Sequence, residues 1–267
     1  LDLELFKVGS FRNGSIAALI ISMGEFGILF AIPLWLQNVL LLTPIESGVV
    51  LLWLAGGAFL ASGVGGGLSG KISPRTMVQS GVALELIGAI GIALFASTEA
   101  GVWSIAPFLF IYGVGVGLAT AQLTGVIMVD VTMDKIGQAS GSQSTVRQVG
   151  SALGIAVLGT MLFTGVQSSL ETRIAEQSIS SEQSSAIVNL VVDSAGGVIP
   201  SLPELLQSPA TGAPLSKEVA DQITADAGQA FTDGAKASAW AAAGFLLLGL
   251  ISTLNIGSRR KKEEPAN

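Results

Sequence analysis

Two acidic residues stand inside long apolar stretches of the sequence. Glu25 lies in Ser-Met-Gly-Glu-Phe-Gly, and Glu85 lies in Val-Ala-Leu-Glu-Leu. A carboxylate at the depth of a membrane core is costly unless it is paired, hydrated or protonated. Such a group can take up a proton on one side of a membrane and release it on the other. Each is therefore a candidate for proton coupling or cation recognition, and the alternative is a protonated or hydrogen-bonded contact between helices. The sequence offers neither acid an obvious basic partner at its own depth.

Arg147 is a third candidate, in the first turns of its apolar segment in Ser-Thr-Val-Arg-Gln-Val-Gly. We expect it to bind a carboxylate near the membrane surface, Asp130 or Asp134, and so to lock a gate at that end of the protein. The alternative is that its side chain extends to the lipid headgroups. Gly150 and Gly154 indicate that this helix face packs against protein, which favours the ion pair.

Glycines recur at a spacing of four residues in three of the apolar segments. Small residues at this spacing let two helix backbones approach each other closely, without lipid between them. We expect such helix packing at Gly63 and Gly67, at Gly113 and Gly117, and at Gly150 and Gly154. The string Gly65–Gly70 fits a G-x-G-x-x-G pattern but ends an apolar helix and follows no strand, so we do not read it as a nucleotide site.

The composition excludes several kinds of chemistry. Cys and His are both absent, which removes disulfides, thiol nucleophiles, imidazole metal ligands and Ser–His–Asp catalysis. The sequence contains no Walker loop, paired-metal cluster or nucleophile elbow. We therefore predict no catalytic residue, no bound metal and no cofactor. A net charge of -6 and a pI of about 4.7 argue against nucleic acid as a partner.

The apolar segments that carry these residues are long enough to cross a lipid bilayer. Charged residues make up 12% of the chain, against about a quarter in soluble domains. A spanning helix needs about 20 mostly apolar residues. Six segments qualify, running approximately Ser15–Gln37, Ser47–Ser69, Met77–Ser97, Val102–Val129, Gly141–Val166 and Ala237–Ile256. The sequence thus predicts an all-α integral membrane protein whose first partner is the bilayer.

The basic residues predict the orientation of these helices, because Lys and Arg collect on the cytoplasmic side. They precede the first segment, lie between the second and third and between the fourth and fifth, and follow the last. The short loops Asn38–Glu46 and Thr98–Gly101 on the other side contain none. We therefore expect a multi-pass plasma-membrane protein with both termini in the cytoplasm. Along the chain this gives a cytoplasmic lead-in at 1–14, membrane helices within 15–166, a long extracytoplasmic loop at 167–236, a last membrane helix at 237–256 and a basic cytoplasmic tail at 257–267.

The long loop is rich in Ser, Gln, Ala and acidic residues. We interpret it as a solvated spacer in preference to a ligand-binding domain, because its composition is that of a chain with little to bury. Leu170–Gln177 and Lys217–Phe231 are candidates for short surface helices. We expect the Pro-bearing segment Ile199–Pro214 to be irregular.

Three stretches carry a resemblance to a known family. They are Leu5–Asn13 with Phe30–Gln37, then Gly67–Arg75, and, most specifically, Gly141 with Thr145–Ala156. In these stretches, in its helix order and in the long outer loop, the chain resembles the C-terminal half of the EmrB/QacA-type multidrug–proton antiporters of the major facilitator superfamily. The likeness covers nearly the whole chain. The sequence departs from the family pattern at Gly70, where an acidic residue is usual, at Trp53, where Pro is common, and near Leu41, where Gly is common.

The resemblance implies two inverted three-helix repeats, one half of a major facilitator fold, facing a missing N-terminal half across a central cavity. It implies export of small hydrophobic or cationic compounds, with a proton as the coupling ion, by a chain that is here a C-terminal fragment. The cavity would be lined by the first, second, fourth and fifth segments, with polar contacts from Gln37, Gln122, Thr124 and Gln148. The signature-loop residues Lys71 and Arg75 would join Arg147, Asp130 and Asp134 in a cytoplasmic gate. The coupling acids of the family lie partly in the absent half, so the resemblance assigns no role to Glu25 or Glu85.

Two other classes of function remain open at this point. One is a non-transporting six-helix membrane subunit or scaffold. The other is a membrane-embedded enzyme, which without His and Cys would need carboxylates clustered at one depth. A metal-coordinating distance between Glu25 and Glu85 would favour the enzyme.

Overall fold

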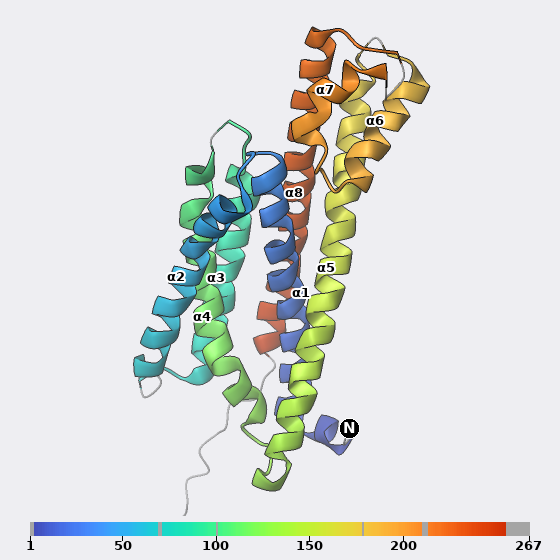
Figure 1. Ribbon diagram of the computed structural model, residues 1–267. Helices are drawn as coiled ribbons and strands as arrows, with labels where there is room; N and C mark the ends of the chain where they lie inside the picture. Colours follow the sequence, from blue (N-terminus) through green and yellow to red (C-terminus); the bar gives the residue numbers. More distant parts are fainter. Residues whose placement is uncertain (1–2, 69–70, 100, 178, 210–212, 255–267) are drawn as a thin grey trace, which may run out of the picture.

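A computed structural model describes residues 3–68, 71–99, 101–177, 179–209 and 213–254 (Figure 1). Within these ranges the chain is helical and has no strand. The long helices are α1 (Gly9–Asn38), α2 (Pro44–Leu68), α3 (Pro74–Phe95), α4 (Ala106–Met128), α5 (Ile136–Ile174) and α8 (Lys217–Leu254). The short ones are η1 (Leu3–Lys7), η2 (Val102–Ser104), η3 (Met133–Lys135), α6 (Ser181–Asp193), η4 (Ile199–Ser201) and α7 (Leu202–Leu206). Six of the described helices are long and apolar enough to cross a bilayer, which confirms the predicted all-α membrane fold.

Local sequence determines where two of the membrane helices begin. The Ser73 hydroxyl accepts a hydrogen bond from the backbone N–H of Thr76 at 3.2 Å, and Pro74 is the first helical residue of α3. This is an N-cap followed by a residue whose fixed φ suits the first turn. At the start of α2, the Glu46 carboxylate accepts from the Thr43 N–H at 2.8 Å, and the Thr43 hydroxyl accepts from the Glu46 N–H at 3.3 Å. This reciprocal pair is a capping box.

Helices α5 and α8 extend well beyond the other four (Figure 1): the helix expected to end near Val166 continues to Ile174, and the one expected to begin near Ala237 begins at Lys217. In α5 the apolar residues Leu158, Leu162, Val166, Leu170 and Ile174 recur every four positions, and all are fully buried. A stripe with this period lies on one face of a helix and buries it against a neighbour. The stripe continues after the mean hydropathy has fallen, which is why a search for apolar segments ends too early.

The described residues between 167 and 236 form a folded unit, which we call the cap. Helix α6 starts at an N-cap, where the Ser180 hydroxyl accepts from the Gln183 N–H at 3.2 Å. The buried faces of α6, η4 and α7 pack onto the parts of α5 and α8 that lie within 167–236. The core of the cap consists of Ile187, Val188, Val191, Ile199, Leu202, Leu206, Ile223 and Phe231. The prediction of a solvated spacer missed this core. Helix α6 was not predicted, and the segment expected to be irregular contains η4 and α7.

The six long helices form two interleaved groups, α2–α3–α4 and α1–α5–α8, and the second group carries the cap (Figure 1). Helix α1 packs along α5 and α8, while α4 packs along α2 and α3. In chain order the six helices form two triplets, α1–α2–α3 and α4–α5–α8. The first helix of each triplet packs against the second and third helices of the other triplet. Since the chain reverses direction at each crossing, the two triplets are related as inverted repeats.

Glycines lie at several of these helix contacts. A Cβ added at Gly150 would lie 2.5 Å from the carbonyl oxygen of Leu19, and one at Gly154 would collide with the backbone of Met23. On α4, Cβ atoms added at Gly113 and Gly117 would likewise collide with the backbone carbonyls of Leu54 and Ala58 on α2. These glycines let helix backbones touch.

The expectation for the other glycine pair is wrong within this chain. Around Gly63 and Gly67 on α2, no described atom lies within 4 Å of an added Cβ. Both glycines lie on a face of α2 that none of the described helices covers.

Candidate functional site

An ion pair lies inside the helix bundle, between α1 and α5. Glu25 comes from the middle of α1, and its side chain is only 6% exposed. Nη2 of Arg147 lies 3.5 Å from Oε2 of Glu25. Two expectations are thereby corrected: Glu25 has a basic partner, and the partner of Arg147 is neither Asp130 nor Asp134. The physical reason is that leaving an ionised acid without a counter-charge costs more free energy when the acid is buried in the bundle than when it contacts water.

The packing of α1 against α5 brings these two side chains together. The contacts of Gly150 with Leu19 and of Gly154 with Met23 show that the two helices run side by side in the same direction. Arg147 precedes Gly150 by about one turn, and its long side chain reaches Glu25 from there. The sequence predicted the glycine face, but not the helix that packs against it.

Glu85 lies on the other side of α4, on the face of α3 that packs there. A Cβ added at Gly115 would lie 2.5 Å from the backbone N of Glu85 and 2.7 Å from its Cγ. Glu85 is 0% exposed. Neither carboxyl oxygen has a hydrogen-bond partner among the described residues. The close contact of Gly115 on α4 with the backbone of Glu85 on α3 leaves no room for water at this interface.

Tyr112 is a member of this site that sequence reasoning missed. It lies on α4 about one turn before Gly115, is 0% exposed, and its hydroxyl has no partner within the described chain. A Cβ added at Gly88 of α3 would lie 2.6 Å from the Tyr112 Cβ. The signal available in the sequence was that this is the single Tyr of the chain, placed in an apolar helix.

Helix geometry places Glu25 toward the same part of α4. Gly14 of α1 packs against Ile127 of α4, where an added Cβ would lie 2.5 Å from the Ile127 Cγ1. Glu25 follows Gly14 by eleven residues, which is about three helical turns, so both lie on one face of α1. Because α1 and α4 run in opposite directions, eleven residues forward on α1 correspond to eleven residues back on α4, which leads to Val116, about one turn from Tyr112. The charges of Glu25 and Arg147 both act on Glu85.

The resulting cluster, Glu25, Glu85, Tyr112 and Arg147, can hold and exchange a proton. It contains two acids, one fixed cation and one phenol, all in or beside the packed centre of the bundle. Among the residues that the structure describes, no group of three or more Asp, Glu, His or Cys side chains is arranged to hold a metal ion.

The four predicted polar cavity residues do not form one group. Gln37 lies at the cap end of α1, half-buried, whereas Thr124 lies near the opposite end of α4. Thr124 accepts a hydrogen bond from Nε2 of Gln143 at 3.2 Å, which joins α4 to α5. Gln143 is buried and was not predicted. Gln122 is half-buried and Gln148 is exposed.

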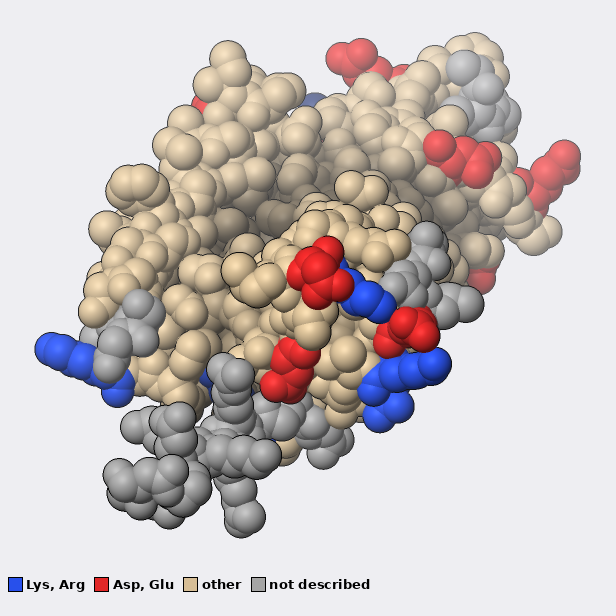
Figure 2. Space-filling model, turned by 90° about the horizontal axis from the view of Figure 1, so that it is seen from below, with Lys and Arg blue, Asp and Glu red and all other residues tan. Residues whose placement is uncertain are grey.

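Charged side chains gather at the end of the bundle opposite the cap, where Figure 2 shows acidic and basic groups standing on a mostly uncharged surface. A guanidinium N–H of Arg75 donates to the backbone carbonyl of Leu254, which lies near the C-terminal end of α8. Lys71 is exposed in the turn between α2 and α3. Asp130 lines a hollow together with Lys7, and Asp134 is exposed in η3.

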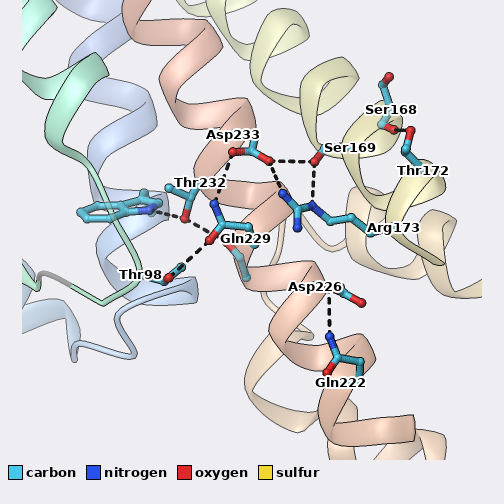
Figure 3. A network of polar contacts seen from close by, with 12 residues as sticks. Thr98, Ser168, Ser169, Thr172, Arg173, Gln222, Asp226, Gln229, Thr232 and Asp233 are labelled. Atoms are coloured by element: carbon cyan, nitrogen blue, oxygen red, sulfur yellow. Dashed lines mark hydrogen bonds and ion pairs between the residues drawn. The ribbon is translucent and has the colours of Figure 1, made fainter. Parts of the chain in front are cut away.

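A second polar network joins the cap to the bundle (Figure 3). The indole N–H of Trp35 on α1 donates to the Thr232 hydroxyl of α8 at 3.0 Å, and both residues are buried. Asp233 follows Thr232 on α8, and its carboxylate accepts a hydrogen bond from the guanidinium of Arg173 on α5 at 3.0 Å. Ser169, Gln229 and Thr98 complete the network, in contacts of 2.9 to 3.4 Å. It fixes the cap ends of α1, α5 and α8 relative to one another, and no motif in the sequence predicted it.

Comparison with known sequences gives a consistent family assignment. The sequence model of the Major Facilitator Superfamily matches residues 3–155. The chain is 28% identical over 206 residues to the multidrug resistance protein Stp of Mycobacterium tuberculosis, covering 75% of this chain and 38% of that protein. It is 28% identical over 260 residues to the multidrug efflux pump LfrA of Mycolicibacterium smegmatis, covering 97% and 48%.

A third relative is the tetracycline resistance determinant of Streptomyces rimosus, which is 30% identical over 171 residues, or 61% of this chain and 48% of that protein. The chain thus spans less than half the length of each of these three relatives.

Proposed function

The chain belongs to the major facilitator superfamily of membrane transporters, and from this premise we propose that it forms the C-terminal half of a proton-coupled drug exporter. The relatives named for multidrug and tetracycline resistance support drugs as the cargo. We propose small hydrophobic or cationic compounds, carried in a cavity that a partner N-terminal half completes. The family match supports a transporter in preference to an enzyme.

The observation that carries the proton coupling is the buried pair of Glu25 and Arg147, 3.5 Å apart. An ionised Glu25 holds Arg147, whereas a protonated Glu25 is neutral and releases it. A neutral Glu25 no longer attracts Arg147, and in a medium of low dielectric constant the loss of that attraction is large. Gain of a proton therefore loosens the contact between α1 and α5, and loss of the proton restores it. In the proposed cycle, this exchange accompanies the rocking of the two halves that alternates access to the cavity.

We further propose that the protein lies in the plasma membrane with the cap outside and the opposite end in the cytoplasm. Lys71 is exposed and Arg75 is half-buried, and the position of both at the end opposite the cap supports this orientation. With alternate crossings, η1 and the start of α1 then also face the cytoplasm.

The test is export by the complete transporter carrying Glu25→Gln, a substitution that keeps the side-chain shape and removes the exchangeable proton. We expect energised cells to lose most proton-driven efflux of ethidium, while the amount of protein in the membrane is unchanged. Glu99→Gln is the matched control, because Glu99 is exposed in the connection after α3, and it should export like the parent. Efflux with unchanged rate and unchanged pH dependence in Glu25→Gln would rule out Glu25 as the coupling acid.

A further inference from the structure

Among the described residues, the interior of the bundle has one cation, Arg147, for two acids, Glu25 and Glu85. Arg147 lies within ion-pair distance of Glu25, and Glu85 is 0% exposed with no hydrogen-bond partner for either oxygen in the described chain. An unpaired buried charge is far more costly than a neutral acid at the same place. While Glu25 is ionised and holds Arg147, Glu85 must therefore be neutral.

In the predicted membrane segments of the helices around Glu85, the described residues contain no charged side chain other than Glu25 and Arg147. α4 contributes the phenol of Tyr112, α1 contributes Glu25, and the cation on α5 is Arg147. The membrane part of α8, from Ala237 to Leu254, contains no Asp, Glu, Lys, Arg, His or Tyr. The same is true of α2 after Glu46.

We propose that Glu25 and Glu85 share a single proton, and that Glu85 takes over as the counter-charge of Arg147 whenever Glu25 is neutral. The O–H bond broken at Glu85 is matched by the O–H bond formed at Glu25, so the net charge of the cluster is zero in both states. Two interacting acids of this kind titrate as a unit. The exchange deepens the proposed proton coupling, and its role in transport rests on that proposal. The location of the proton can nevertheless be measured whatever compound is exported.

The direct measurement is infrared difference spectroscopy of the intact polypeptide, reading the C=O band of protonated carboxylic acids. We expect the parent to show one buried band that Glu85→Gln abolishes. Glu25→Gln should abolish the same band, although Glu85 is still present, because Glu85 then ionises to balance Arg147. Glu99→Gln is the matched control: it removes an exposed carboxyl outside the cluster, and the buried band should remain.

Further variants keep the test decisive if Glu25→Gln folds poorly. Arg147→Gln removes the cation, so both acids should become neutral and a second band should appear. In thermal unfolding, the double variant Glu25→Gln/Glu85→Gln should lower Tm by more than the two single shifts together, because only the double variant leaves Arg147 without any carboxylate.

A Glu85 band that survives in Glu25→Gln, a parent without any Glu85-dependent band, or additive Tm shifts would overturn the shared proton. Each of these results is compatible with loss of export in Glu25→Gln. The failure of this inference is therefore distinguishable from failure of the proposed function.

Discussion

The contact between α1 and α5 at Gly150 permits a quantitative test of how the ion pair is positioned. In Gly150→Ala the new Cβ would lie 2.5 Å from the carbonyl oxygen of Leu19 and 3.1 Å from its Cα. Both are backbone atoms and cannot rotate away, so α1 and α5 must separate by about 0.5–1 Å, a gap that forfeits part of the dispersion attraction along the interface. Overpacking of this kind costs about 1–3 kcal/mol, and Ala in place of a helical Gly recovers about 0.5–1 kcal/mol. We therefore expect a net loss of about 1–2 kcal/mol of unfolding free energy.

For a chain of this size such a loss corresponds to a fall in Tm of about 2–8 °C. The assay is thermal unfolding of the detergent-purified protein, followed by tryptophan fluorescence. Gly244→Ala on α8 is the matched control, because no described atom lies within 4 Å of its added Cβ, and its Tm should stay level or rise slightly. If Gly150→Ala unfolded at the same temperature as this control, the close approach of α1 and α5 would be refuted. The positioning of Arg147 by that approach would be refuted with it.

Two further predictions concern the cap. In Thr232→Val the buried indole N–H of Trp35 loses its acceptor at 3.0 Å. This should lower the free energy of unfolding by about 1–3 kcal/mol and change the fluorescence emission of Trp35. An unaltered Tm and emission spectrum would show that this hydrogen bond does not hold the cap in place. Since the chain has no Cys, single-Cys variants report orientation without background. Ser185→Cys on α6 should react with a membrane-impermeant maleimide added to whole cells, and Met133→Cys, 87% exposed at the opposite end, only after permeabilisation; the reverse pattern would contradict the proposed orientation.

The candidate site was predictable only in part. Glu25 and Glu85 stand out because an acid in an apolar segment is a local property of the sequence. Their relation to each other is not local: Arg147 and Glu25 are separated along the chain by the three long helices α2, α3 and α4, and Tyr112 joins them only because α4 passes between α1 and α3. The predicted partners of Arg147 were the nearest acids in the sequence, and the structure pairs it with a distant one.

The cap shows the same division between local signal and tertiary outcome. Its low mean hydropathy suggested a chain with little to bury, yet residues such as Leu170 and Ile174 continue the four-residue stripe of α5. The period was present in the sequence, but what the stripe packs against was not.

The sequence by itself determined six apolar helices, the uneven distribution of basic residues between their ends, and which helix faces carry spaced glycines. These follow from segment length, charge and residue spacing, which act within one element. Only the tertiary structure decided which glycine faces meet a neighbour, which cation balances which acid, and that the long connection folds on the ends of α5 and α8. Those outcomes depend on which helices become neighbours, and the bundle selects its neighbours by the packing of whole helix surfaces, so no single segment encodes them.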